Sequence, residues 1–257
     1  MSHDYQEFIA NFKQESGIDL YLYKEAQMKR RLTSLRDKKG FADFREYYHS
    51  LHKNPNLFNE LLDRITINVS EFYRNRQRWE VLENKVVPHL LNNRKHIKIW
   101  SAACSTGEEP YTLAIILSQY LPIDQIKIVA TDIDEKAIQR ARLGVYPERA
   151  LREMPIKMKQ KYFTKQQSLY KISDNIKSCV TFKKHNLLAD QYETQNDLIV
   201  CRNVLIYFTE DAKSTIYTKF SEALNKDGIF FVGSTEQIFS PHQYQLKSFD
   251  TFFYKKD

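Results

Sequence analysis

Two adjacent glutamates follow a lone glycine in the segment "WSAACSTGEEPYTLAI", residues 100–115. Small and apolar residues come before this turn and an amphipathic run follows it, which predicts a strand, a tight loop and a helix. In an α/β protein such a loop lies at the carboxyl edge of the sheet, where ligands bind. A dinucleotide-binding loop would read G-x-G-x-x-G, but Gly107 stands alone here and Glu108 would repel a phosphate.

A further carboxylate, Asp132, ends the next predicted strand, 25 residues after Gly107. Acids at this place bind ribose hydroxyls in nucleotide-binding α/β folds. A site with such an acid, extra negative charge and no phosphate loop suits an adenosine derivative that carries positive charge. S-adenosylmethionine meets both demands through its sulfonium and α-ammonium groups.

Helix capping alone could also explain these residue types. Ser105 and Thr106 each have a glutamate three residues later, which is the spacing of a capping box. Asp132 and Asp134 could cap the helix that is expected to begin near residue 135. Taken alone, the loop leaves both interpretations open.

The elements that must position these residues divide the chain into two parts. Up to about residue 75 the pattern is wholly helical, with Tyr5, Phe8 and Phe12 among the residues that share the first apolar face. From about residue 97 short β-rich runs alternate with helical runs, which predicts a mostly parallel sheet. The tail "QLKSFDTFFYKK" predicts an antiparallel strand pair at the sheet edge, and the stretch 162–179 predicts a small β excursion.

Composition limits the class of protein. The net charge of +7 favours an acidic partner, and leaves nucleic acid, anionic lipid and an acidic protein surface open. The polar start and the lack of a long apolar run argue against a signal peptide or a membrane span. Cys104, Cys179 and Cys201 lack the spacing of metal ligands, so we expect no metal site, and their odd number suits a reducing cytosol.

Five segments in order resemble the CheR family of chemotaxis receptor glutamate methyltransferases: "TINVSEFYR", "WSAACSTGEEPY", "ATDIDEKAI", "KHNLL" and "DLIVCRNVLIYF". The resemblance implies an α/β fold of the class I S-adenosylmethionine-dependent methyltransferases, which is Rossmann-like, with an antiparallel C-terminal edge and a small inserted β-subdomain. The expected divisions are a helical domain over 1–75, a linker helix over 76–95 and a methyltransferase domain over 96–257. The β-subdomain is expected at about 162–182.

Carried over position by position, the resemblance implies a site for S-adenosylmethionine and its product S-adenosylhomocysteine. Glu108 would contact the α-ammonium end and Asp132 the ribose. Asn68, Ser70 and Arg74 would reach the methionine portion. Asn186 and Leu187 would contact the adenine, and Arg202 and Asn203 would close the pocket. Tyr207 matches the family's proposed catalytic tyrosine, and Arg94 is the candidate for a catalytic arginine in the interdomain linker.

The implied reaction is methyl transfer to glutamate carboxylates of membrane-bound chemoreceptors, which forms methyl esters for chemotactic adaptation. The partner would be the cytoplasmic helical bundle of the receptor, docked on the basic residues Arg30, Arg31 and Lys38. The enzyme would be a cytoplasmic monomer recruited to receptor arrays, without membrane insertion. The polar composition of residues 162–179 predicts that no strong tether to a receptor C-terminal peptide is used.

Two other functions compete with this interpretation. A nucleic-acid methyltransferase would suit the basic charge, but residues 201–204 lack the Asn/Asp-Pro-Pro-Tyr/Phe motif that holds a flipped base. A signalling module that binds without turnover is the other alternative. The presence of Arg202, Asn203 and Tyr207 argues only weakly against it.

Overall fold

The computed structural model describes residues 3–66, 68–92 and 96–257. Its contacts separate into a helical unit, Met1–Asn68 with Tyr207–Ile216, and a sheet unit, Val69–Ile206 with Tyr217–Asp257. The boundary thus falls earlier than the predicted one near residue 75, and a short segment from the second half of the chain belongs with the N-terminal helices. No helix in the described part of the chain is both long and apolar enough to cross a bilayer.

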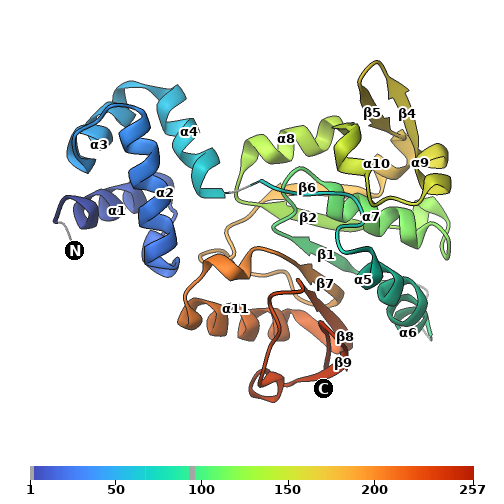
Figure 1. Ribbon diagram of the computed structural model, residues 1–257. Coiled ribbons are helices and arrows are strands. Elements are labelled where there is room, and N and C mark those ends of the chain that lie inside the picture. Colours follow the sequence, from blue (N-terminus) through green and yellow to red (C-terminus); the bar gives the residue numbers. More distant parts are fainter. Residues whose placement is uncertain (1–2, 67, 93–95) are drawn as a thin grey trace. The chain divides into compact units, whose positions relative to one another are not determined.

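The helical unit packs its apolar stripes together, as the helical periodicity predicts. Its elements, blue to cyan in Figure 1, are α1 (His3–Ser16), η1 (Leu20–Leu22), α2 (Glu25–Lys38), α3 (Phe44–Lys53) and α4 (Pro55–Thr66). Phe8, Phe12 and Phe44 are at most 1% exposed, and burial of each ring contributes roughly 1.5–3 kcal/mol. Asp43 begins α3 by accepting a hydrogen bond from the backbone N–H of Glu46 at 2.8 Å.

The sheet unit is built on a seven-stranded sheet in the order β6-β2-β1-β7-β8-β10-β9. The strands are β1 (Ile99–Ala102), β2 (Ile128–Asp132), β6 (Val180–Lys184), β7 (Asn196–Cys201), β8 (Leu224–Val232), β9 (Leu246–Asp250) and β10 (Phe253–Lys256). The first five pair in parallel, and β10 and β9 pair antiparallel beside β8. The predicted parallel sheet with an antiparallel C-terminal edge is confirmed.

Helices and helical turns connect these strands. They are α5 (Arg76–Val81), η2 (Leu82–Val86), α6 (Val87–Leu91), α7 (Glu108–Leu117), η3 (Ile123–Gln125), α8 (Glu135–Leu143), η4 (Glu148–Leu151), α9 (Ile156–Tyr162), α10 (Asp174–Ser178), η5 (Leu205–Tyr207), α11 (Glu210–Ala223) and η6 (Pro241–Tyr244). The π-helical turn η2 joins α5 to α6. Helical structure thus runs from residue 76 to 91 within the expected linker helix over 76–95, and Arg94 lies outside the described residues.

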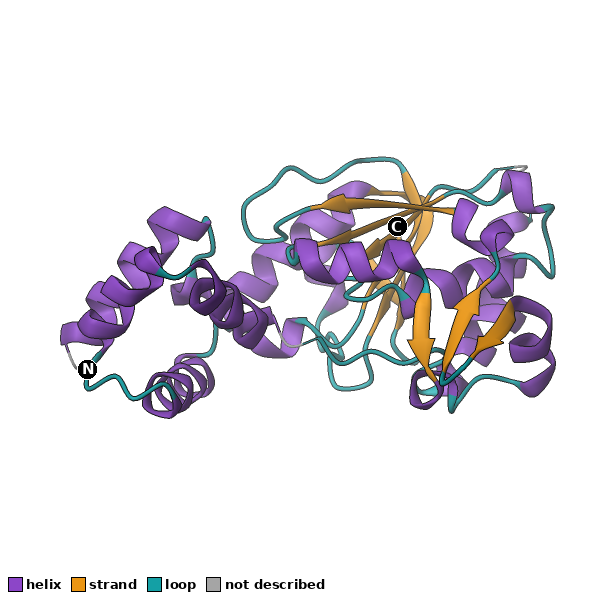
Figure 2. Ribbon diagram, turned by 90° about the horizontal axis from the view of Figure 1, so that it is seen from above, coloured by secondary structure: helices purple, strands orange, loops and turns teal. Residues whose placement is uncertain are grey.

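A separate three-stranded antiparallel sheet has the order β3-β5-β4, with β3 (Val145–Pro147), β4 (Phe163–Gln166) and β5 (Leu169–Ile172). Its strands lie apart from the main sheet in Figure 2. The small sheet thus begins at Val145 and ends at Ile172, whereas we expected about 162–182. Strand β3 has three residues and ends in proline, so it shows no alternation of apolar and polar residues that would predict it. Strand β6, which lies partly in the expected range, belongs to the main sheet.

Candidate functional site

The carboxyl ends of the parallel strands meet along one edge of the main sheet. Ala102 is in register with Thr131 on β2 and with Cys201 on β7, which in turn is in register with Val232 on β8. The loops that follow these strands therefore start side by side. This edge carries most of the sequence-predicted site residues of the sheet unit.

The loop after β1 is pressed against α8 and depends on its glycine. Gly107 has φ +92°, and a Cβ at this position would lie 2.8 Å from Ala141 Cβ. The Tyr146 hydroxyl donates to the Thr106 carbonyl at 2.8 Å and fixes the same loop from the small sheet. Ser105 also has a positive φ of 48°, a conformation that costs free energy for a side-chain-bearing residue and is found mostly at functional sites.

Helix capping explains only one of the acidic residues of this edge. Asp134 caps α8 by accepting from the backbone N–H groups of Lys136 and Ala137 at 2.9 and 3.1 Å. The N-cap of α7 is Gly107, which makes no side-chain cap hydrogen bond, so a capping box at Ser105 or Thr106 is wrong. The glutamates of the loop thus need another explanation.

Asp132 connects the loops that follow β1, β2 and β6. It is 7% exposed and accepts from the backbone N–H of Ser105 at 2.7 Å and of Asp134 at 2.9 Å. Its own carbonyl accepts from the backbone N–H of His185 at 2.9 Å, which connects it to the loop after β6. Burial raises the pKa of the Asp132 carboxyl to about 6, although the backbone N–H groups favour its ionised form.

Glu108 brings the loop after β1 to the segment that precedes α5. It is 4% exposed, and its carboxylate accepts from the Thr106 hydroxyl at 2.7 Å. Burial raises the pKa of Glu108, while hydrogen bonds from the Thr106 and Ser70 hydroxyls lower it in part. Ser70 and Glu108, both predicted from the sequence, are therefore neighbours.

Asn186 and Leu187 lie on the loop after β6, next to the end of β2. The side-chain oxygen of Asn186 accepts from the Leu188 N–H at 3.0 Å, and its own N–H donates to Asp190 at 2.8 Å. Leu187 is 7% exposed. These bonds hold a compact turn one residue beyond His185, so the predicted adenine and ribose residues share one corner of the edge.

Arg74 lies in a segment that hydrogen bonds connect to α7, to α5 and to the end of β7. The Tyr73 N–H donates to the Thr112 hydroxyl on α7 at 3.2 Å. The Arg74 carbonyl accepts from Trp79 Nε1 at 3.0 Å and from Arg202 Nη2 at 2.8 Å. The guanidinium of Arg74 itself donates to the Val69 carbonyl at 3.0 Å.

Arg202 packs against this segment. Its guanidinium carbon lies 5.0 Å from the Trp79 ring centroid and 4.7 Å from that of Phe231, and Nη1 lies 3.7 Å from the Glu109 carboxylate. Burial lowers the pKa of Arg202, and burial raises that of Glu109 to about 7. Arg202, which we expected to close the pocket, holds the backbone of Arg74, and its role in the pocket stays a prediction. Sequence reasoning missed Glu109 and Trp79 as partners of Arg202.

Asn68 and Tyr207 belong to the helical unit and are described there. The Asn68 amide lies 3.4 Å from the Thr66 hydroxyl. The Tyr207 carbonyl accepts from the Lys24 N–H at 2.8 Å, and its ring centroid lies 5.1 Å from the Arg31 guanidinium carbon. Their predicted roles in the cofactor site and in catalysis stay predictions.

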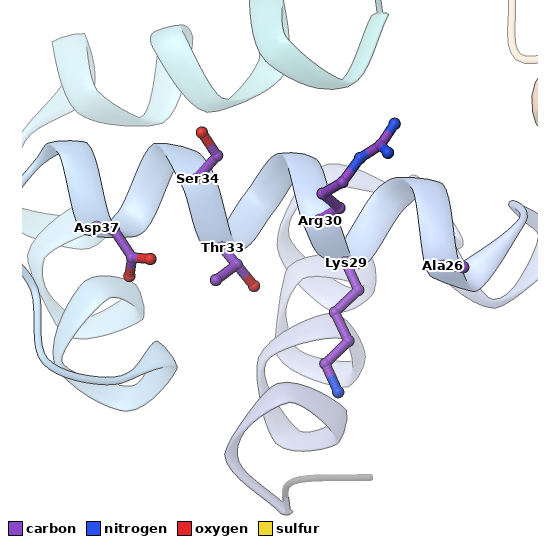
Figure 3. Close-up of a pocket in the computed structure, with 6 residues that line it drawn as sticks. All are labelled: Ala26, Lys29, Arg30, Thr33, Ser34 and Asp37. Atoms are coloured by element: carbon purple, nitrogen blue, oxygen red, sulfur yellow. The ribbon is translucent and has the colours of Figure 1, made fainter.

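Two basic residues of α2, Lys29 and Arg30, line an open hollow on the helical unit. Figure 3 shows Lys29 and Arg30 extending from α2 beside the short side chains of Thr33 and Ser34. Arg30 and Lys38 are exposed, whereas Arg31 is half-buried against Tyr207. The predicted docking residues are thus two exposed cations and one that packs against an aromatic ring.

The cysteines do not contribute nucleophiles to this edge. Cys104 and Cys201 are buried, and burial raises the pKa of both thiols well above the usual value. Within residues 3–66, 68–92 and 96–257, no group of three or more His, Cys, Asp or Glu residues is arranged to hold a metal ion.

The acceptor set at the sheet edge fits an adenosine derivative with positive charge. Glu108 and Asp132 are buried carboxylates, which accept hydrogen bonds, and hydroxyl and ammonium groups are donors. A phosphate would meet these charges without the glycine-rich backbone that binds it elsewhere. The roles of Glu108 and Asp132 at the ammonium group and the ribose stay predictions.

Comparison with known proteins gives a family match over nearly the whole chain. Residues 3–66 match the family model described as "CheR methyltransferase, all-alpha domain", and residues 68–253 match "CheR methyltransferase, SAM binding domain". A chemotaxis protein methyltransferase of Listeria innocua is 43% identical over 100% of this chain and 98% of its own length. Its counterparts in Listeria monocytogenes (100% of this chain, 98% of its own length) and Borreliella burgdorferi (86% and 83%) are 42% and 38% identical.

Proposed function

Because the chain belongs to the CheR methyltransferase family, we propose that it methylates glutamate side chains of membrane-bound chemoreceptors and so forms methyl esters in chemotactic adaptation. The chain is an S-adenosylmethionine-dependent methyltransferase, and the receptor glutamate is the proposed acceptor. The observation that carries the cofactor assignment is the pair of buried carboxylates, Glu108 and Asp132, at a sheet edge without a phosphate-binding loop.

The proposed cofactor contacts follow the strand ends. Asp132 would accept from the ribose hydroxyls and Glu108 from the α-ammonium group, while Asn186 and Leu187 would hold the adenine. Asn68, Ser70 and Arg74 would line the methyl-transfer side, and Arg202 and Asn203 would close the pocket. When bound, S-adenosylmethionine supplies a methyl group that is electrophilic because it is attached to a sulfonium.

The acceptor needs orientation more than it needs a base. A glutamate carboxylate is ionised near neutral pH, since its ordinary pKa is about 4.3. A tyrosine hydroxyl and an arginine guanidinium can hold a carboxylate in line with a methyl group, and Tyr207 and Arg94 are the proposed pair. Removal of water from the acceptor would add to the rate.

The proposed receptor surface is the exposed side of α2, where Arg30 and Lys38 face solvent and the hollow beside Thr33 and Ser34 is open (Figure 3). A receptor bundle rich in methylation-site glutamates is acidic and helical, so it matches this basic surface in charge. The enzyme would work as a cytoplasmic monomer that joins the receptor arrays.

A methyl-transfer assay tests the proposed acceptor. Purified enzyme and radiolabelled S-adenosylmethionine are incubated with receptor-containing membranes, and with nucleic acid as the alternative substrate. We expect base-labile label on the receptor, as methyl esters require, and none on nucleic acid. Receptor variants with glutamine at every methylation-site glutamate should take up no label, and label retained on them would contradict the proposal.

A further inference from the structure

Glu236 lies in the loop after β8 and gathers four backbone N–H groups. One carboxylate oxygen accepts from Asn203 at 2.6 Å and from Gly233 at 2.8 Å. The other accepts from Leu205 at 2.7 Å and from Ile206 at 3.3 Å. The side chain is 5% exposed, so these bonds form largely out of water. Charge-assisted bonds to backbone N–H groups are about twice as strong as neutral ones.

The turn that Glu236 holds would not keep its shape without help. Asn203 has φ +62°, a conformation that side-chain-bearing residues rarely adopt. Leu205 and Ile206 are the first two residues of η5, whose N–H groups have no partner within the helical turn itself. Glu236 satisfies these donors from another loop and ties the end of β7 to the end of β8.

Gly233 makes the arrangement possible. A Cβ at this residue would collide with the Glu236 carboxylate and would lie 2.9 Å from the Asn203 nitrogen. The absence of a side chain therefore lets the carboxylate approach Asn203 closely. Ser234, in the same loop, accepts from the Asn75 amide at 2.8 Å, so the loop also contacts the segment that follows Arg74.

We propose that Glu236 is a positioning residue of the methyltransferase site, which sets the backbone of residues 203–206 so that Asn203 meets the cofactor. This inference rests on the proposed role of Asn203. The role proposed for Glu236 needs no contact with cofactor or acceptor. It acts through the four N–H groups that it accepts from.

Only a carboxylate can do this. Both oxygens of Glu236 accept two N–H groups each, whereas glutamine has one oxygen and one amino group. In the variant Glu236→Gln, the side-chain NH2 group takes the place of one carboxylate oxygen in either orientation of the amide. It then faces two backbone N–H groups, and two donors cannot form a hydrogen bond. The substitution keeps the size of the side chain and breaks half of its bonds.

Asp197 offers a matched control on β7, the strand whose far end Glu236 holds. It is 6% exposed, and its carboxylate accepts from the Lys98 N–H and from the Asn225 amide, both at 2.8 Å. It lies at the beginning of β7, away from the carboxyl edge. Asp197→Asn thus also places a donor against a buried donor, but far along the strand from the site.

The test is calorimetric titration with S-adenosylhomocysteine at a temperature where thermal melts show both variants folded. We expect Glu236→Gln to weaken binding about tenfold and to lower kcat on receptor membranes at least as much. Asp197→Asn should stay within twofold of the wild type in both measurements and lose only thermal stability. Equal affinities for the two variants would overturn the proposal.

Gly233→Ala approaches the same contact from the other side and keeps the proposal testable if Glu236→Gln does not fold. It should weaken S-adenosylhomocysteine binding in the same direction, and wild-type affinity in Gly233→Ala would count against the positioning role. Since the titration contains no methyl acceptor, its result does not depend on whether receptor glutamates are the substrate. A failed positioning role and a wrong acceptor therefore give different results.

Discussion

Asp132 and Glu108 at the sheet edge are less than a tenth exposed, whereas Arg30 and Lys38 on α2 face solvent. The buried carboxylates are fixed by short hydrogen bonds, and burial raises their pKa. The exposed cations attract through water, where salt screens them over roughly 8 Å at physiological ionic strength. The difference predicts a rigid, pH-sensitive cofactor site and a salt-sensitive docking surface. Substitutions should disrupt each of them separately.

The largest effect is expected from Gly107→Ala. The positive φ should cost about 1–2 kcal/mol of stability, and the crowding against Ala141 should add roughly 1–3 kcal/mol. Gly40→Ala is the matched control, because Gly40 has φ +81° but nothing within 4 Å of the added Cβ. Urea denaturation should show a larger loss of unfolding free energy for Gly107→Ala. Equal losses would mean that the loop after β1 yields to crowding.

Asp132→Ala is expected to weaken S-adenosylhomocysteine binding tenfold or more, because the ribose would lose its charged acceptor. Asp134→Ala is the control, since it removes the cap of α8 and should cost about 1 kcal/mol of stability, with affinity within about threefold. Calorimetry and thermal melts measure the two effects. Wild-type affinity in Asp132→Ala would remove this residue from the site.

The pH dependence of binding sharpens the same point. Asp132 has a pKa of about 6 and would bind the ribose in its ionised form, so affinity should be full above pH 7 and fall as the carboxyl takes up a proton. One pH unit below the pKa the loss should be about tenfold. Asp132→Asn should bind more weakly at neutral pH and show a flatter profile between pH 5 and 7.5. A wild-type profile as flat as that of the variant would contradict the assignment.

A smaller effect is expected from Arg30→Glu on the docking surface. Exposed ion pairs contribute about 0–1 kcal/mol, so KM for receptor should rise no more than about fivefold, and the rise should shrink in high salt. Arg31 is left in place because its guanidinium packs against Tyr207. Lys53→Glu on α3 changes the net charge equally away from α2, and it should leave KM near the wild-type value. Equal KM values for the two variants would show that net charge alone guides docking.

The smallest effect concerns the small sheet. Strand addition by a peptide needs an edge with apolar pockets, but the edge strand β4 exposes Thr164, Lys165 and Gln166. We expect no binding of a peptide that copies the C-terminus of a receptor from the same organism, and no inhibition of methylation by it. Micromolar binding that competes with methylation would contradict this.

The parts of the molecule that depend on local pattern were predictable from the sequence. The strand, loop and helix over residues 100–115 and the cap of α8 follow from periodicity and residue type. Strand β3 was not predictable, because its three residues pair with β5, more than twenty residues away. The stacking of Arg202 on Trp79 and Phe231 is also non-local. Glu236 had one signal that was overlooked: "GSTE" follows β8 much as "STGEE" follows β1.

Steady-state kinetics on Asp132→Ala and Arg30→Glu, with KM for S-adenosylmethionine and for receptor membranes measured in one assay, test the division of roles most directly. We expect Asp132→Ala to raise KM for the cofactor tenfold or more, with KM for receptor within twofold. We expect Arg30→Glu to raise only KM for receptor, and less so as salt is added. If Arg30→Glu weakened the cofactor as much as the receptor, or Asp132→Ala left the cofactor unaffected, the separation of a buried cofactor site from an exposed docking surface would be contradicted.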